Sequence, residues 1–94
     1  MFEVHVESPG RARLTGRLDA AEVDQARITL DALPGPLVLD CSGLDYVSSA
    51  GIGLLVETYK RLHQAGHTLR LVQLLPRVRN VFAYAGLDRV LTLE

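Results

Sequence analysis

The chain has 94 residues, of which 48% are hydrophobic and 22% are charged, proportions that are ordinary for a globular protein. This length supplies the core of one domain, residues 1–94, and is too short for two. The formal net charge of −1 predicts no general attraction to nucleic acid or to an anionic membrane surface, so neither class of partner is expected.

The start of the chain predicts a β-hairpin. Apolar and polar residues alternate from Phe2 to Glu7 and again from Arg11 to Leu18, which is the period of half-exposed strands, and Ser8-Pro9-Gly10 between them is a turn signal. The alternation contains no long apolar run, so we expect no signal peptide, no membrane insertion and a cytoplasmic location. We interpret Arg11, Arg13 and Arg17 as part of a solvated strand face, and the alternative interpretation is a patch to which a partner docks.

A helix and a third strand are expected next. Asp19 and Glu22 have the spacing of a capping box, with Asp in place of the usual Ser or Thr. The apolar stripe of the helix consists of Val23, Ala26, Leu30 and Leu33. Pro34-Gly35-Pro36 stops this helix, and the continuous apolar run Leu37–Leu39 predicts a strand that is covered on both faces.

The segment from Leu37 to Leu55 is the most informative part of the chain. It predicts a buried strand, a tight polar loop, and the start of an amphipathic helix with Ser48 and Ser49 at its amino end. The buried stripe of that helix consists of Ile52, Leu55, Val56, Tyr59 and Leu62. A helix start presents unpaired N–H groups and positive dipole charge, so a serine or a phosphoserine has a physical reason to lie there. From the residues alone, we expect one serine to cap the helix and the other to face water.

The remainder of the chain completes the fold. Leu69–Leu74 predicts another strand, Pro76 suits the first turn of a third helix, and Val90–Leu93 predicts a short last strand. The apolar stripe of the third helix consists of Val78, Val81, Phe82 and Ala85. The order β-β-α-β-α-β-α-β predicts a single α/β domain with helices packed on a mixed sheet, in which an antiparallel hairpin precedes parallel strands.

No catalytic, metal or cofactor site is expected. Cys41 has no evident His or Asp partner and is more simply a core residue, with a small enzyme that uses this thiol as a third and weaker hypothesis. His63 and His67 have a metal-like spacing but no evident third ligand. Gly51 and Gly53 each cost about 1 kcal/mol of helix propensity relative to Ala, which suggests that a backbone or a partner surface approaches them closely.

The sequence resembles the STAS family of bacterial anti-sigma-factor antagonists, in its short single-domain form. The resemblance rests on the run LTGRLD at Leu14–Asp19, on the strand-loop-helix segment, and on the run AGLDRVL at Ala85–Leu91. The family signature is Asp-Ser-Ser/Thr/Ala-Gly-Leu, in which the serine after the aspartate is phosphorylated. The resemblance implies that Ser49 is the phosphoacceptor, while Ser48 stands in place of the aspartate and is a second candidate acceptor.

The resemblance further implies a non-enzymatic binding switch. Its partners would be an anti-sigma factor that is itself a serine kinase of the GHKL ATPase type, and a serine phosphatase that resets the switch. Binding would release a sigma factor, and phosphorylation of Ser49 would end the interaction. The implied docking surface comprises Asp45, Tyr46, Ser48, Ser49, Ala50, Gly51, Ile52 and Gly53, with Arg17 and Glu57 at its margins. The alternative is a STAS accessory subunit of a phospholipid-transporting ABC system.

Overall fold

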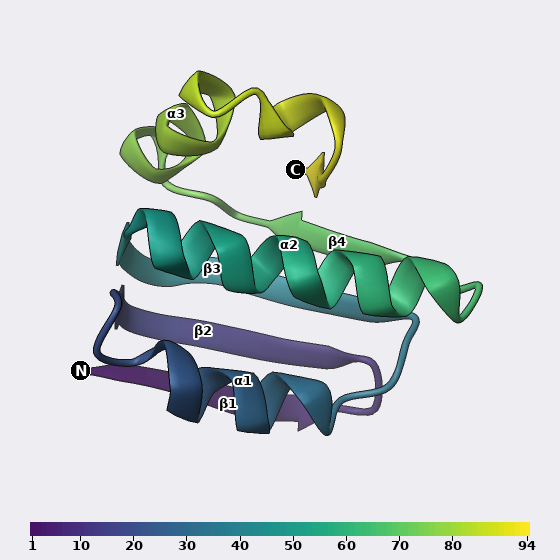
Figure 1. Ribbon diagram of the computed structural model, residues 1–94. Coiled ribbons are helices and arrows are strands. Elements are labelled where there is room, and N and C mark those ends of the chain that lie inside the picture. Colours follow the sequence, from purple (N-terminus) through teal and green to yellow (C-terminus); the bar gives the residue numbers. More distant parts are fainter.

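Five strands form one sheet in the computed structural model, which describes residues 1–94 (Figure 1). The strands are β1 (Phe2–Ser8), β2 (Arg11–Leu18), β3 (Leu37–Val47), β4 (Leu69–Val72) and β5 (Thr92–Leu93). The helices are α1 (Val23–Asp31), α2 (Ser49–Gln64) and α3 (Pro76–Tyr84), followed by the short 3-10 helix η1 (Leu87–Arg89). The spatial order is β1-β2-β3-β4-β5, with β1 and β2 antiparallel and the other pairs parallel. These observations confirm the predicted α/β fold.

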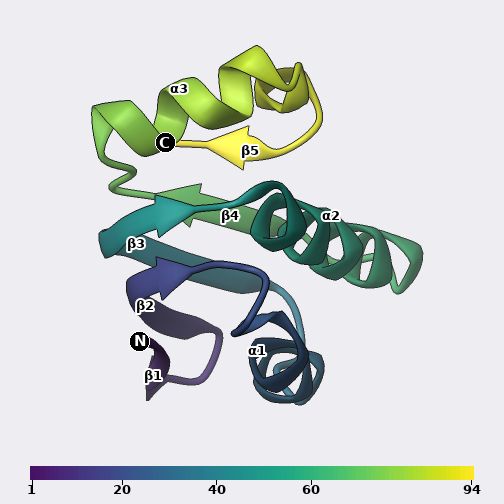
Figure 2. The same ribbon diagram turned by 60° about the vertical axis from the view of Figure 1, so that its left-hand side comes forward.

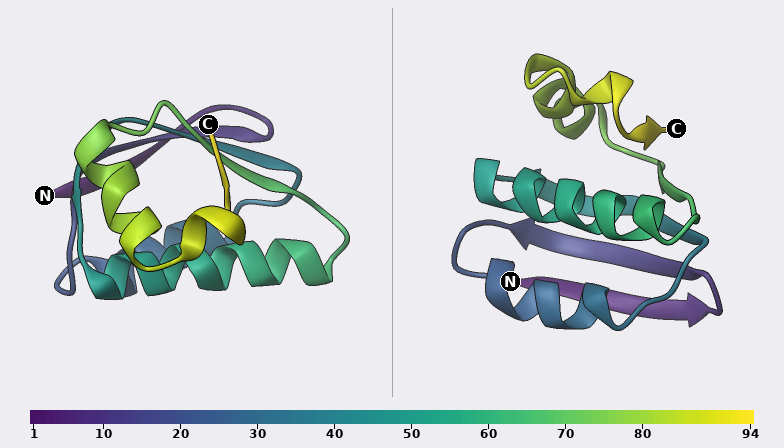
Figure 3. Two further views of the ribbon diagram at one scale, coloured as in Figure 1. Left: turned by 90° about the horizontal axis from the view of Figure 1, so that it is seen from above. Right: turned by 45° about the vertical axis from the view of Figure 1, so that its right-hand side comes forward.

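The helices lie on one face of the sheet and leave the other face open, as Figure 2 and Figure 3 show. On β3, the side chains of Leu37 and Leu39 are 2% and 0% exposed, whereas Val38 between them is only half-buried. The expectation of a strand covered on both faces is therefore wrong. The two faces of the sheet differ in polarity because all the helices cover the same face and the other face is open to solvent.

The open face of the sheet is lined by paired charges. Arg11 and Arg13 of β2 both pair with Glu7 of β1, at 3.6 and 3.3 Å, and Arg11 also reaches Asp40 of β3 at 3.4 Å. Arg17, further along β2, is exposed. The predicted solvated arginine face is confirmed. None of the helices is both long and apolar enough to cross a membrane.

β3 is longer than the sequence predicts, because the expected polar loop after Leu39 is part of the strand. β2 pairs with β3 over its whole length, from Arg11 opposite Val38 to Leu18 opposite Val47. Two register shifts occur along this pair. Bulges of this kind add unpaired residues to one strand and interrupt its two-residue alternation, so the pattern no longer looks like a strand.

The structure corrects one local prediction at the start of α1. Helix α1 has Glu22 as its N-cap, with no side-chain hydrogen bond there. The Asp19 carboxylate instead accepts the backbone N–H of Ala21 at 3.2 Å and stabilises the turn before the helix, so the predicted capping box is wrong. Of the four residues of the predicted apolar stripe, Val23, Ala26 and Leu30 are buried on α1, whereas Leu33 lies beyond the end of the helix and is half-buried against the core.

Helix α3 begins with Pro76 in its first turn, as predicted. Its contact with the core is narrower than the predicted stripe, because only Val78 and Phe82 are buried. Val81 is 37% exposed and Ala85 is exposed, so these two assignments to the core are wrong. The two buried residues are four apart and occupy a single edge of the helix, which turns Val81 away from the core.

Candidate functional site

The start of α2 uses its two serines differently. Ser48 is the N-cap, with extended backbone angles (φ −88°, ψ 173°), and its hydroxyl oxygen accepts the backbone N–H of Gly51 at 3.2 Å. Ser48 is half-buried, whereas Ser49 and Ala50 are exposed. The prediction that one serine caps the helix and the other faces water is confirmed. The hydroxyl of Ser49 is accessible to a protein that approaches this helix end.

The two glycines of the first turn of α2 have different surroundings. A β-carbon on Gly51 would lie 2.6 Å from the carbonyl oxygen of Leu18 and 2.9 Å from a methyl carbon of Val47. The same carbonyl oxygen accepts the backbone N–H of Ser48 at 2.9 Å, so the helix start is pressed against the end of β2. By contrast, a β-carbon on Gly53 would meet nothing within 4 Å. The fold therefore explains Gly51 and leaves Gly53 unexplained.

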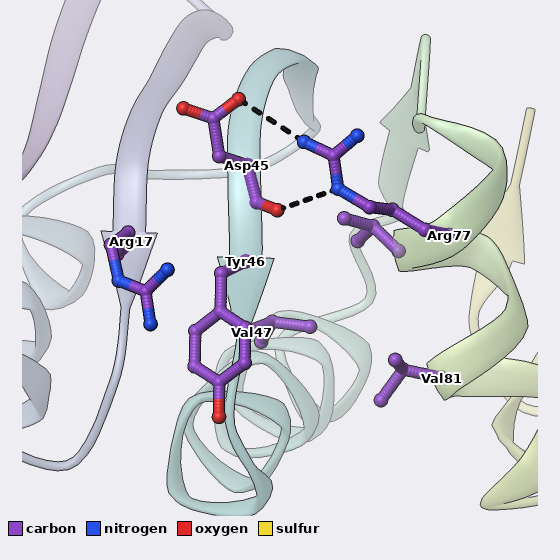
Figure 4. A pocket seen from close by; sticks show the side chains of 7 residues that line it. Arg17, Asp45, Tyr46, Val47, Arg77 and Val81 are labelled. Carbon is purple, nitrogen blue, oxygen red and sulfur yellow. Dashed lines mark hydrogen bonds and ion pairs between the residues drawn. The ribbon is translucent and has the colours of Figure 1, made fainter.

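A groove of about 370 Å³ lies between the end of β3 and α3 (Figure 4). It is lined by Arg17, Asp45, Tyr46, Val47, Arg77, Val78 and Val81. The guanidinium carbon of Arg17 lies 4.3 Å from the centre of the Tyr46 ring, a cation–π contact. On the opposite side, Arg77 donates from Nε to the backbone carbonyl of Asp45 at 3.1 Å and from a terminal nitrogen to its carboxylate at 3.5 Å.

The structure brings together most of the sequence-predicted docking residues but not all of them. The exposed members at this end of the molecule are Arg17, Asp45, Tyr46, Ser49, Ala50 and Gly53. Gly51 and Ile52 are buried and present little surface to a partner. Glu57 is eight residues after Ser49, about 12 Å along the helix, and it pairs with Arg27 of α1 at 3.0 Å. This exposed pair links α2 to α1, away from the start of α2.

Sequence reasoning did not find the contribution of α3 to this surface. Arg77 and Val81 are one turn apart on α3 and both line the groove. Their i, i+4 spacing was visible in the sequence. Which side of a short helix faces the sheet depends on tertiary packing, however, so the pattern alone assigned Val81 to the core.

The environment of Cys41 argues against a nucleophilic role. Its side chain is 0% exposed, and its Sγ lies 3.5 Å from the carbonyl oxygen of Leu39. Burial raises the pKa of the Cys41 thiol to about 12, with a smaller contribution from the negative charge of Asp40. A thiol with such a pKa is not ionised near neutral pH, and only the thiolate is a good nucleophile. Cys41 is a core residue, as the simpler hypothesis predicted.

The remaining titratable groups form no reactive cluster. The backbone N–H of Ser42, 2.9 Å from the Asp40 carboxylate, is the main cause of a lowered Asp40 pKa. The Ser42 hydroxyl, Arg11 and Arg13 act in the same direction, against the partial burial of the carboxyl. His63 stacks on Tyr59 with ring centres 5.5 Å apart. Nowhere do three His, Cys, Asp or Glu side chains come together as metal ligands.

Comparisons with known proteins agree on the family. The family model described as "Mlab, STAS domain" matches residues 2–93. BtrV of Bordetella bronchiseptica, named as an anti-sigma factor antagonist, is 37% identical over 79 residues, covering 80% of this chain and 68% of BtrV. The anti-sigma F factor antagonist of Paenibacillus polymyxa is 26% identical over 86 residues, covering 86% of this chain and 74% of that protein.

The fold is also found among solved structures. The anti-sigma factor antagonist SpoIIAA in its unphosphorylated form superposes with a TM-score of 0.77 at 22% sequence identity. The superposition covers 100% of this chain and 88% of that one. At this level of identity the likeness shows a shared fold.

Proposed function

The chain belongs to the STAS domain family, and we propose that it is an anti-sigma-factor antagonist whose activity is ended by phosphorylation of Ser49. The relatives named as antagonists of anti-sigma factors support this proposal. In the proposed cycle, the partner is an anti-sigma factor that is also a serine kinase and uses its own ATP. Binding frees a sigma factor, and a separate serine phosphatase restores the unphosphorylated form. This chain supplies the docking surface and the phosphoacceptor rather than catalytic groups.

The exposure of Ser49 is the single observation that carries the proposal. Ser49 is the first residue of α2 and is exposed, whereas the neighbouring Ser48 hydroxyl is engaged by the N–H of Gly51. A kinase can therefore reach one hydroxyl without disturbing the helix cap. Ser48 is the less favourable acceptor, because its modification would remove a hydrogen bond that stabilises the helix start.

The surface around Ser49 is suited to close contact with another protein. Ser49, Ala50 and Gly53 are small, exposed and adjacent on one face of the first turn of α2. Gly53 has open space around it, although glycine costs about 1 kcal/mol of helix propensity at such a position. Close approach of a partner's surface accounts for a glycine that the fold itself does not require.

Phosphorylation would act on the partner rather than on the fold. A phosphate adds about −1.5 to −2 charges near neutral pH. The first turn of α2 contains no acidic residue, and the positive end of the helix dipole tolerates added negative charge. An interface shaped around a small hydroxyl does not tolerate it. A loss of about 4 kcal/mol of binding free energy lowers the affinity roughly a thousandfold, which is enough to switch the interaction off.

The experiment mixes the purified chain with candidate GHKL-type anti-sigma factors and measures binding and intact mass before and after ATP is added. We expect the parent to bind, to gain the mass of one phosphate on Ser49, and then to dissociate. Ser49→Ala should bind and stay bound after ATP, and Ser49→Asp should bind poorly. Ser8→Asp is the matched control. Ser8 is an exposed serine beside the turn of the β1–β2 hairpin, at the other end of β2 from the start of α2. Parent-like behaviour of both Ser49 variants would contradict the proposed switch.

A second candidate function is a STAS accessory subunit of a phospholipid-transporting ABC system. Ser48 favours it, because this hydroxyl replaces a carboxylate that the phosphorylated family members carry beside the acceptor. Such a subunit would use the same helix start to bind an ATPase without a phosphorylation cycle. Affinity purification of the tagged chain distinguishes the two functions. Recovery of a permease and its ATPase supports the accessory subunit, and recovery of a kinase or sigma factor supports the antagonist.

A further inference from the structure

We infer that the groove beside the start of α2 binds an acidic, partly apolar segment of the anti-sigma factor, with Arg17 as the contact for a carboxylate. This inference rests on the proposed function and deepens it. It extends the docking surface from the α2 signature to the end of β3 and to α3. It also assigns a chemistry to the part of the partner that lies there.

The apolar part of the groove provides a place for aliphatic side chains. Val47 and Val78 form its buried base, at 3% and 2% exposure. Tyr46 and Val81 stand on opposite sides of it (Figure 4) and are 40% and 37% exposed. Large apolar side chains that gather around a groove are typical of a surface that association covers.

The charge of the groove selects an acidic partner. Elsewhere in the chain most arginines are neutralised by ion pairs, namely Arg11, Arg13, Arg27, Arg61 and Arg70. Arg17 forms no ion pair, and its guanidinium lies over the Tyr46 ring. Stacking of this kind orients a guanidinium while its N–H groups stay available for a planar acceptor such as a carboxylate.

Arg77 adds to this positive charge. Its only carboxylate partner is Asp45 at 3.5 Å, and the two side chains are 66% and 62% exposed. Two arginines and one aspartate leave the groove with a formal charge of +1, in a chain whose net charge is −1. Rim charges of this kind set partner choice and association rate. A basic segment would be repelled here, and an acidic one attracted.

The position of the groove gives the phosphorylation switch an electrostatic cause. Tyr46 and Val47 lead directly into Ser48, whose backbone N–H is held by the carbonyl of Leu18 next to Arg17. A phosphate on Ser49 would therefore stand beside the surface that receives the partner's carboxylates. Like charges at an interface disfavour a complex, so the modification would expel an acidic segment in particular.

The first experiment uses nuclear magnetic resonance of the whole chain and a blocked peptide of alternating glutamate and leucine. A matched peptide with glutamine in place of glutamate is the control. We expect saturable shifts of the Tyr46 and Val81 amides with the glutamate peptide, and binding at least about tenfold weaker for the glutamine peptide or for Arg17→Gln. Lys60→Gln removes an exposed α2 cation that forms no ion pair and should behave as the parent. Equal binding of the two peptides, or parent-like binding by Arg17→Gln, would overturn the inference.

The second experiment measures the affinity for the anti-sigma factor captured in the test of the proposed function. Arg17→Glu should weaken that binding by at least about tenfold and reduce its salt dependence, whereas Lys60→Glu should not. If the chain binds the anti-sigma factor and Arg17→Glu has no effect, the inference fails and the proposed function stands. If no anti-sigma factor binds but the glutamate peptide occupies the groove, the proposed function fails and the groove's preference for acidic segments is retained.

Discussion

The guanidinium of Arg61 on α2 donates a hydrogen bond to the carbonyl of Leu30, the last buried residue of α1, at 3.0 Å. The same terminal nitrogen also donates to the carbonyl of Leu33 at 2.9 Å. The Leu30 carbonyl also accepts the backbone N–H of Leu33 at 3.0 Å, so Arg61 adds a side-chain donor at the end of α1, where the last carbonyls have no partner within the helix. This contact fixes the position of the helix that presents Ser49.

Replacing this guanidinium should loosen the contact between α1 and α2. We expect Arg61→Ala to destabilise the fold by about 2–3 kcal/mol, because hydrogen bonds from a charged group to partly buried carbonyls are lost. Chemical denaturation followed by circular dichroism measures this change. The matched control is Arg27→Ala, which removes the exposed pair between Arg27 and Glu57 that also joins α1 to α2. That variant should change stability little, since exposed ion pairs contribute little. Equal effects would contradict the role given to Arg61.

The two glycines at the start of α2 should respond to alanine with opposite signs. Gly51→Ala places a methyl group 2.6 Å from the Leu18 carbonyl oxygen, an overpacking that costs about 1–3 kcal/mol. We expect this cost to exceed the helix-propensity gain of about 1 kcal/mol. Gly53→Ala meets no atom and should stabilise the fold by up to about 1 kcal/mol. Urea unfolding of both variants measures these changes in stability. If Gly51→Ala left the stability unchanged, the end of β2 would have to move to make room for the methyl group.

The order of strands and helices could be predicted because its signals are local. Alternation, apolar stripes, Pro76 and the turn residues each act within a few positions of the chain. The two bulges of β3 arise from its pairing with a distant strand, which hid the strand nature of the residues between Leu39 and Ser48. The exposed Ser49 could be predicted because a helix start is a local signal. Arg77 could not, because it reaches the site only through the packing of α3.

The capping hydroxyl of Ser48 should be tested by two substitutions. Ser48→Ala loses the hydrogen bond to the Gly51 N–H and should destabilise the fold by about 1 kcal/mol. Ser48→Asp retains an acceptor and adds a negative charge that the helix start favours, so its stability should match the parent. Thermal unfolding measures both. In the kinase assay, Ser48→Ala should still gain one phosphate and Ser49→Ala none. A phosphate on Ser49→Ala would identify Ser48 as an acceptor.

Cys41 should be unreactive while the chain is folded. With its pKa raised to about 12, the thiol is ionised at pH 8 only on the order of one part in ten thousand, and no reagent reaches it in the core. Iodoacetamide should therefore modify it slowly in buffer and rapidly in urea, with a rate that follows the unfolding transition. Mass spectrometry of the quenched samples measures the modified fraction. Fast alkylation of the folded chain would reopen the hypothesis of an enzyme that uses this thiol.

Asp40 should make the stability depend on pH in a defined direction. Its pKa is lowered in the folded chain, chiefly by the Ser42 N–H, so the unfolded chain binds this proton more tightly. The stabilisation is therefore present above the unfolded pKa of about 3.9 and is lost as the pH falls through the lower folded value. Asp40→Asn keeps an acceptor for Ser42 but loses the charge that Arg11 faces, and should cost up to about 1 kcal/mol at pH 7. Urea midpoints of parent and variant should converge as the pH is lowered through this range. A difference that persists unchanged in acid would show that the carboxylate charge is not the stabilising feature.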